Sequence, residues 1–208
     1  MGTCYIIGAG EFYGELKPAR GDLIIAADGG LDTLLSLGIT PDLIIGDMDS
    51  TAAAGAFAEV ERIFFPVKKD ETDTHLAYLE GAKRGYSDFR IYGGVGGRED
   101  HTFANLSLLI YGKMLGHNLT LVGNGCEWLA LFNEEKRIYG KPSDGFSVFA
   151  FGGEARGVSI KGALYEAEDI TLSPYFSLGV SNSFSSEEVA LSVREGALLV
   201  MREKGARR

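Results

Sequence analysis

Short apolar runs recur through the first part of the chain, and stretches with helical spacing separate many of them. This alternation is typical of a sheet of parallel strands joined by helices. We expect strands at residues 3–8, 23–27, 43–46, 62–67, 89–92 and 118–122. We expect helices at residues 30–37, 51–59, 72–84 and 101–115. In the last helix, apolar residues share one face at helical spacing, namely Phe103, Leu106, Leu109, Ile110 and Met114.

The pattern changes near residue 126, beyond which the runs are short and alternate between apolar and polar residues. Turns rich in Gly and Pro separate these runs, and Gly152-Gly153 is one such predicted turn. We expect strands at residues 128–132, 146–151, 158–160, 176–180, 189–193 and 198–201. The chain is therefore predicted to divide into an α/β domain, residues 1–126, and a smaller antiparallel β domain, residues 127–208.

The composition excludes several classes of protein. The chain has 20 Lys and Arg residues against 29 Asp and Glu residues, a net charge of −9, and this balance argues against nucleic acid as a partner. Cys4 and Cys126 lie in different predicted elements, so neither a disulfide scaffold nor a zinc site is indicated, and a cytoplasmic setting is the simplest expectation. No segment approaches the ~20 apolar residues that a membrane helix needs, so we expect no membrane partner.

An acidic pair follows the predicted strand 43–46. Asp47 and Asp49 lie two residues apart, so in an extended segment their side chains point to the same side. Converging carboxylates repel one another unless a cation joins them, and Mg²⁺ favours carboxylate oxygens. We interpret the pair as metal ligands. The alternative is an acidic turn in which Asp49 or Ser50 caps a helix.

A second acidic cluster, Asp70–Asp73, follows the predicted strand 62–67. If a helix begins near Thr72, Asp70 and Asp73 lie around its first turn and can converge on the same ligand as the first pair. Together the two clusters could hold more than one Mg²⁺. The alternative is an acidic helix start, which stabilises a helix by only ~0.3–1 kcal/mol per charge. That alternative explains one cluster, but not why both follow strands on the same predicted edge.

Two more segments follow predicted strands. Gly10 comes after the first strand and could face a phosphate, although the segment lacks the later glycine of a dinucleotide-binding fingerprint. Asp28 and Gly29 come after the strand 23–27, where backbone amides could meet a phosphate and Asp28 could bind a metal or a substrate. The alternative is a helix-capping Asp beside a tight glycine turn.

The segment Gly93–His101 begins with four glycines in five residues. Such glycines permit backbone conformations that expose amide donors, and Arg98 adds a charge able to fork onto phosphate oxygens. Asp100 could orient Arg98 or cap the helix, and His101 could bind a phosphate or transfer a proton. We interpret the segment as a phosphate clamp rather than a flexible loop, because a structural turn rarely needs four glycines around an Arg. The glycines assigned to nucleotide binding are Gly94, Gly96 and Gly97.

These segments resemble, in their order along the chain, the motifs of the thiamine pyrophosphokinase family. The resemblance rests on Asp28–Gly30, Gly46–Ser50, Asp70–Asp73 and Gly93–His101. Asn105, one helical turn after His101, fits the helix that closes the last motif. In the second part, Gly179–Phe184 is similar to the segment that receives the vitamin, and its alternative is a polar hairpin turn.

The resemblance implies a Rossmann-like α/β nucleotide-binding and catalytic domain followed by a β-sandwich that binds thiamine. It implies a homodimer with thiamine near the subunit interface, and a reaction in which ATP and thiamine give AMP and thiamine diphosphate. The catalytic residues would be Asp47, Asp49, Asp73 and Arg98; the nucleotide ligands Asp28, Gly29, Gly94, Gly96, Gly97, Arg98, Asp100 and His101; the vitamin ligands Ser181 and Asn182; and the Mg²⁺ ligands Asp47, Asp49, Asp70 and Asp73.

One departure and three alternatives accompany the resemblance. Some family members stack the vitamin on a Trp of the second domain, whereas the single Trp here is Trp128, near the domain junction, so Tyr175 or Phe184 is a candidate for that role. A Mg²⁺-dependent phosphohydrolase would use the same carboxylates to direct water at phosphorus. A binding module would hold thiamine and ATP without forming AMP. A pterin diphosphokinase would catalyse closely related chemistry, because the acidic and glycine motifs bind the phosphates rather than the acceptor.

Overall fold

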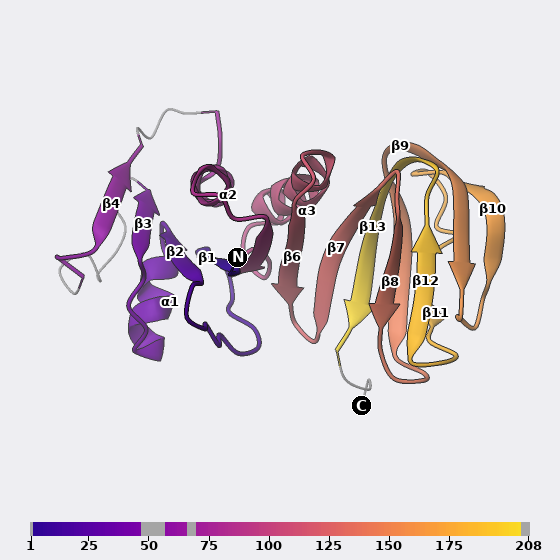
Figure 1. Ribbon diagram of the computed structural model, residues 1–208, viewed down its shortest axis with the longest axis horizontal. Coiled ribbons are helices and arrows are strands. Elements are labelled where there is room, and N and C mark those ends of the chain that lie inside the picture. Colours follow the sequence, from indigo (N-terminus) through magenta and orange to yellow (C-terminus); the bar gives the residue numbers. More distant parts are fainter. Residues whose placement is uncertain (1, 47–56, 66–69, 205–208) are drawn as a thin grey trace. The chain divides into compact units, whose positions relative to one another are not determined.

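The computed structural model describes residues 2–46, 57–65 and 70–204, which form two compact units (Figure 1). The first unit is Met1–Leu108 with Gly116–Asn124, and the second is Leu109–Leu115 with Gly125–Arg208. The fold is mixed α/β, with parallel strands in the first unit and antiparallel strands in the second. Among the helices of the described ranges, none combines the length and apolarity needed to cross a bilayer.

The first unit is a parallel sheet with the strand order β4-β3-β2-β1-β5-β6. Its strands are β1 (Cys4–Ile7), β2 (Leu23–Ala27), β3 (Leu43–Gly46), β4 (Glu61–Phe64), β5 (Asp88–Tyr92) and β6 (Asn118–Gly123). Every residue of β1, β2 and β3 is buried, as expected for parallel strands that are covered on both faces. The six predicted strands of this part of the chain are confirmed, with small differences at their ends.

Three helices belong to the described residues of the first part: α1 (Gly30–Leu37), α2 (Asp73–Lys83) and α3 (Glu99–Met114). The Thr72 side chain caps α2 by accepting a hydrogen bond of 3.2 Å from the His75 backbone amide. These helices are confirmed, whereas most of the predicted helix 51–59 lies outside the described residues. The predicted buried face of α3 is partly wrong, because Phe103 and Met114 are 63% and 57% exposed while Asn105 and Leu108 are buried.

The second unit is antiparallel, and long pairings of β9 and β13 form its centre (Figure 1). Its strand order is β7-β13-β9-β12-β8, and β10 and β11 also pair with β9. The strands are β7 (Cys126–Phe132), β8 (Glu135–Tyr139), β9 (Gly145–Lys161), β10 (Ala167–Leu172), β11 (Asn182–Ser183), β12 (Glu188–Ser192) and β13 (Glu195–Glu203).

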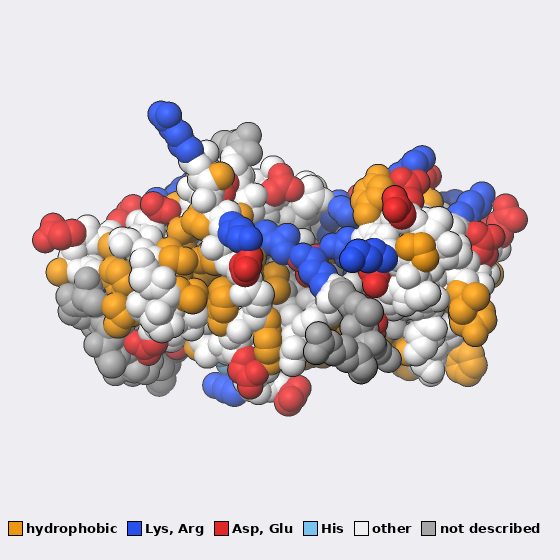
Figure 2. All heavy atoms as spheres, turned by 90° about the horizontal axis from the view of Figure 1, so that it is seen from below, with side chains coloured by type: hydrophobic (Ala, Val, Ile, Leu, Met, Phe, Trp, Pro, Cys, Tyr) orange, Lys and Arg blue, Asp and Glu red, His pale blue; other side chains and the backbone are white. Residues whose placement is uncertain are grey.

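Three predictions for the second unit are wrong in detail. The predicted turn Gly152-Gly153 lies inside β9, where Gly152 adopts a φ of 74°, so the predicted strands 146–151 and 158–160 are parts of one strand. The strands β8, β10 and β11 were not predicted. The predicted strand 176–180 is a turn region whose apolar side chains Phe176 and Leu178 are 72% and 59% exposed. On the face seen in Figure 2, hydrophobic side chains reach the surface among charged ones.

Candidate functional site

A cavity of about 310 Å³ lies in the first unit, where the segments after β1 and β5 meet. The chain order reverses between these neighbouring strands, since β2, β3 and β4 extend the sheet from β1 on one side and β6 follows β5 on the other. Ligands of open parallel sheets bind at such a switch point, beyond the carboxyl ends of the strands. The lining residues are Ala9, Gly10, Asp28, Thr74, Gly93, Gly94, Val95, Gly97, Arg98, His101, Thr102 and Asn105.

The glycine-rich segment after β5 packs directly on the backbone that follows β1. The Gly10 amide donates to the Gly93 carbonyl over 2.8 Å, and the Glu11 amide donates to the Val95 carbonyl over 3.1 Å. Gly93 adopts a φ of 63°, and a Cβ atom there would lie 2.3 Å from the Gly8 carbonyl oxygen. A side chain at this position would therefore push the two segments apart. The close backbone approach explains part of the glycine content of the segment.

Arg98 lies at the cavity wall and is oriented by Asp100. Its Nη2 atom donates to Asp100 Oδ2 over 2.6 Å and its Nε atom donates to Oδ1 over 3.1 Å. These hydrogen bonds raise the pKa of the Arg98 guanidinium and lower the pKa of the Asp100 carboxyl. Asp100 Oδ1 also accepts a hydrogen bond of 3.0 Å from the His101 amide. Both side chains are exposed, so Arg98 can turn toward an anionic ligand at little cost in stability.

Asp28 lines the cavity directly after β2. It adopts a φ of 48°, and its amide donates to the Ile45 carbonyl over 2.8 Å. The N-cap position of α1 is Gly29, and Asp28 lies one residue before it, with its backbone carbonyl accepting a hydrogen bond of 3.2 Å from the Leu31 amide. A Cβ atom at Gly46, the last described residue before Asp47, would lie 3.2 Å from the Asp28 Cα atom. The end of β3 and Asp28 are therefore in close contact.

The predicted metal ligands are described only in part. Asp47 and Asp49 lie outside the described residues. Asp73 is the first residue of α2, and the next residue, Thr74, is buried and lines the cavity, whereas Asp70 is exposed. Within residues 2–46, 57–65 and 70–204, no three His, Cys, Asp or Glu side chains gather as a metal-binding group.

The structure brings together most of the predicted nucleotide-binding residues. Asp28, Gly94, Gly97, Arg98 and His101 line the cavity, and Gly29, Gly96 and Asp100 each adjoin a lining residue. Thr74, Thr102 and Asn105 also line the cavity; none of them was assigned a ligand role from the sequence, although Asn105 was included in the resemblance. Thr102 and Asn105 lie on α3 four and seven residues after Arg98, which directly precedes the helix, and this helical spacing is the signal that could have identified them as lining residues.

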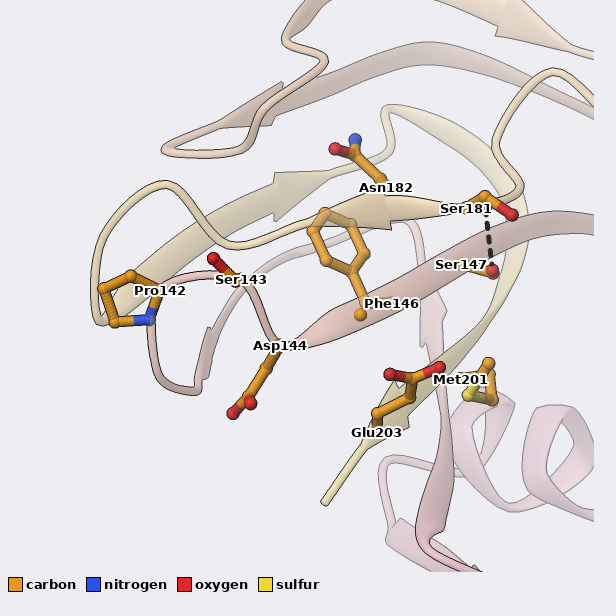
Figure 3. Close-up of a pocket in the computed structure, with 10 residues that line it drawn as sticks. Pro142, Ser143, Asp144, Phe146, Ser147, Ser181, Asn182, Met201 and Glu203 are labelled. Atoms are coloured by element: carbon orange, nitrogen blue, oxygen red, sulfur yellow. Dashed lines mark hydrogen bonds between the residues drawn. The ribbon is translucent and has the colours of Figure 1, made fainter. Parts of the chain in front are cut away.

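A second cavity, of about 350 Å³, lies entirely within the second unit (Figure 3). The start of β9, the end of β13 and the segment leading into β11 form its walls. The Ser181 amide donates to the hydroxyl of the buried Ser147 over 3.1 Å, and Ser181 adopts a φ of 63°. The lining residues are Pro142, Ser143, Asp144, Gly145, Phe146, Ser147, Ser181, Asn182, Met201 and Glu203. The lining thus includes two acidic residues, Asp144 and Glu203, and three serines, Ser143, Ser147 and Ser181.

The side chain of Asn182 is engaged with the protein backbone. Its Nδ2 atom donates to the Tyr165 carbonyl over 2.7 Å, and its Oδ1 atom accepts from the Tyr165 and Ser183 amides over 3.0 and 2.9 Å. Asn182 is only 6% exposed, and in Figure 3 its side chain points away from Glu203. The geometry therefore gives Asn182 a role in holding the segment at Tyr165.

The aromatic candidates for stacking on a ligand differ in exposure. Phe184 is 2% exposed and packs edge-on against Phe146, with 5.3 Å between the ring centres, so its faces are not available. Trp128 stacks on Phe149 in the sheet. Tyr175 is 96% exposed. Of the two candidates named from the sequence, only Tyr175 has an exposed ring, and it does not belong to the lining of this cavity.

Comparison with known proteins matches both halves of the chain to one family. Residues 18–121 match the family model "Thiamin pyrophosphokinase, catalytic domain", and residues 136–198 match "Thiamin pyrophosphokinase, vitamin B1 binding domain". The chain is also 25% identical over 193 residues to a protein of Bacillus subtilis named thiamine pyrophosphokinase, with 86% of each chain covered.

Solved structures share the fold along almost the whole chain. The thiamine pyrophosphokinase of Bacillus subtilis superimposes with a TM-score of 0.89 at 24% identity, covering 98% of this chain and all of the other. The enzyme of Geobacillus thermodenitrificans gives a TM-score of 0.87 at 22% identity, with 98% of each chain covered. The more distant protein of Candida albicans gives 0.79 at 15% identity, covering 97% of this chain and 90% of the other. Since the catalytic-domain model alone covers half of the sequence, the chain belongs to the thiamine pyrophosphokinase family.

Proposed function

We propose that the cavities of the two units divide the work of a thiamine diphosphokinase, which transfers the diphosphoryl group of ATP to the hydroxyl of thiamine and releases AMP. Family membership makes the chain an ATP:thiamine diphosphotransferase. The observation that carries the division is that a glycine-lined cavity lies in the part matched by the catalytic domain, and a hydroxyl-lined cavity lies largely in the part matched by the vitamin-binding domain.

We assign residues 1–126 to a Rossmann-like nucleotide-binding domain and residues 127–208 to a β-sandwich that binds thiamine. The parallel strand order with its switch point supports the first assignment, and the antiparallel pairings around β9 support the second. We also propose that the protein forms a homodimer and acts in the cytoplasm.

The first cavity would receive the triphosphate of ATP. Backbone amides of Gly94, Gly96 and Gly97 can donate to phosphate oxygens, and Arg98 can fork onto them once it turns from Asp100. His101 at the first turn of α3 would add a hydrogen bond or hold a proton. Asp28 and Gly29 would contact the nucleotide from the end of β2.

The acidic residues predicted to bind metal fit a divalent cation in their chemistry, because carboxylates supply the hard oxygen donors that Mg²⁺ prefers. Asp73 is the first residue of α2, which reaches the cavity through Thr74, and Asp70 lies three residues before it in the sequence. Gly46, which precedes Asp47 in the sequence, ends β3 beside Asp28. We propose that Asp47, Asp49, Asp70 and Asp73 would hold Mg²⁺. When bound, the ion neutralises negative charge on the triphosphate.

The reaction places two demands on the chain. The thiamine hydroxyl must approach the β-phosphorus of ATP in line with the departing AMP, and most of the rate acceleration comes from this positioning and from neutralising the phosphate charge. Arg98 and the glycine amides would steady the phosphate oxygens. One of the site carboxylates, Asp47, Asp49 or Asp73, would accept the hydroxyl proton.

The second cavity would receive thiamine. The vitamin carries a fixed positive charge, and the carboxylates of Asp144 and Glu203 make the cavity complementary to a cation. Ser181 would hydrogen-bond to the vitamin, and Asn182 would contribute by holding the adjoining backbone in place. An analogue that lacks the matching polar groups would leave these partners unpaired, which gives selectivity.

The direct test is to incubate the purified protein with ATP and Mg²⁺, with and without thiamine, and to identify every product. We expect AMP and thiamine diphosphate to appear together in equal amounts, and only when thiamine is present. Release of inorganic phosphate without thiamine would instead indicate a phosphohydrolase. Parallel reactions with a pterin alcohol test the neighbouring diphosphokinase activity, and binding of both substrates without AMP would indicate a binding module.

A further inference from the structure

Asn105 is a buried polar residue at the wall of the first cavity. It lies on α3, one turn after His101, and only 4% of it is exposed. Its Nδ2 atom donates a hydrogen bond of 2.8 Å to the carbonyl oxygen of Gly94. A buried amide side chain is kept where its hydrogen bond has a structural or functional purpose, because burying an unpaired polar group is costly.

The Gly94 carbonyl is the middle one of three consecutive carbonyls that are held by donors of the protein. The Gly93 and Val95 carbonyls accept backbone amides of Gly10 and Glu11, over 2.8 and 3.1 Å. The middle carbonyl accepts the side chain of Asn105. The first and third bonds follow from packing against the backbone after β1, whereas the second depends on a single side chain.

Fixing these carbonyls determines what the segment can offer to an anion. A carbonyl oxygen that faces a phosphate repels it, whereas an amide attracts it. In a planar trans peptide the C=O and N–H groups point in opposite directions, so a fixed Gly94 carbonyl also fixes the direction of the Val95 amide. Asn105 thereby sets the orientation of a peptide group at the cavity wall.

The residues around this contact leave little freedom for other arrangements. A Cβ atom at position 94 would lie 2.5 Å from Leu121 Cδ1 and 3.1 Å from Asn105 Nδ2, so the Gly94 peptide fits closely between β6 and α3. Arg98 and His101 line the same cavity, with His101 on the helix that carries Asn105 and Arg98 directly before it. The Asn105–Gly94 bond therefore couples the glycine segment to this helix and to its first turn.

We propose that Asn105 is a positioning residue for the triphosphate of ATP, and that it acts by holding the peptide group between Gly94 and Val95. This inference rests on the proposed function, because it takes the first cavity as the nucleotide site. Asn105 belongs to neither the predicted catalytic set nor the predicted metal ligands. Its contribution is to keep the phosphate-binding backbone in the orientation that accepts an anion.

Two substitutions of similar size test the proposal. Asn105→Asp keeps the shape of the side chain but places a carboxylate against the Gly94 carbonyl, and Asn105→Leu leaves that carbonyl without its donor. Asn124→Asp is the matched control, since it makes the same chemical change at an exposed turn of the same unit. Calorimetry with MgATP gives the dissociation constant without thiamine, and initial rates give KM for each substrate.

We expect both Asn105 variants to weaken MgATP binding by about tenfold or more and to raise KM for ATP in proportion, while KM for thiamine changes by less than about twofold. The control Asn124→Asp should have the same dissociation constant for MgATP and the same KM values as the parent protein. Folded Asn105 variants with a lower melting temperature but unchanged affinity for MgATP would overturn the proposal, since a purely structural residue behaves in that way. A parent protein that binds MgATP but forms no thiamine diphosphate would refute the proposed function, and the affinity comparison would still decide the role of Asn105.

Discussion

The two units form their cavities by different means. In the first unit, segments that follow neighbouring parallel strands meet at one edge of the sheet, and closely packed backbone forms much of the wall. In the second unit, side chains from β9, β13 and the segment before β11 form the wall, and residues far apart in sequence must align across antiparallel pairs. The first arrangement follows from strand order, whereas the second depends on strand register.

The ion pairs of the two units differ in how far they are exposed to solvent. The Arg98–Asp100 pair of the first unit has side chains that are 72% and 65% exposed. Arg98 can therefore leave Asp100 and bind an anionic ligand instead. In the second unit, the side chain of Glu127 is only 3% exposed and binds Arg202 and Lys204 over 2.6 and 2.5 Å. This difference predicts that a substitution of Arg98 impairs catalysis, whereas a substitution of Glu127 impairs stability.

The largest effect is expected for Asp73→Asn. This substitution preserves the shape of the side chain but removes a proposed metal ligand, so turnover should fall by roughly 10³-fold while the melting temperature changes little. Steady-state rates at saturating ATP, thiamine and Mg²⁺ measure it. Glu71→Gln, at an exposed position two residues earlier, is the matched control and should retain nearly full activity. An Asp73→Asn enzyme with near-normal turnover would refute the metal role.

The next effect concerns the stability of the second unit. Glu127→Gln removes a buried carboxylate from two cations, and the free energy of unfolding should fall by about 3 kcal/mol because those cations lose their partner. Denaturant unfolding followed by circular dichroism measures the change. Activity per folded molecule should be retained. A variant of unchanged stability but low kcat would contradict the proposed separation of roles between the units.

A smaller effect is expected for Arg98→Ala. The exposed side chain contributes little to stability, but its loss should lower kcat/KM for ATP by roughly 10²-fold, because a charged phosphate ligand is removed. The kcat/KM of Arg98→Lys for ATP should lie between the values of the parent protein and of Arg98→Ala, since Lys keeps the charge but not the planar fork of the guanidinium. Arg20→Ala, at an exposed position, is the control. Equal rates for Arg98→Ala and Arg20→Ala would remove Arg98 from the site.

The strands of the first unit could be predicted because β1, β2 and β3 are buried at every position and therefore appear as continuous apolar runs. The cavity followed from the same reasoning, since Asp28 and Gly94 come just after strands. The buried face of α3 could not be predicted, because the helix has apolar residues on more than one face and its neighbours decide which face is covered. The role of Asn105 was hidden for the same reason, since it depends on contact with Gly94.

Prediction was weaker in the second unit. In β9 a glycine pair continues a strand through a bend, although the same pair usually marks a turn. The exposed apolar residues Phe176 and Leu178 alternate as in a strand, and the sequence alone does not reveal that they lie outside the core. The side-chain amide of Asn182 could be interpreted as a ligand for the vitamin, whereas the structure engages it with the backbone of Tyr165.

The smallest effect is expected for Ser181→Ala. The substitution removes the hydroxyl proposed to bind thiamine but leaves the backbone bond to Ser147, so KM for thiamine should rise by about tenfold, the value of one hydrogen bond of ~1.4 kcal/mol. Alanine at a φ of 63° is strained much as serine is, so stability should change little. Ser185→Ala, at an exposed position, is the control. If KM for ATP rose instead, the hydroxyl would serve the nucleotide, and the assignment of the second cavity to thiamine would lose its support.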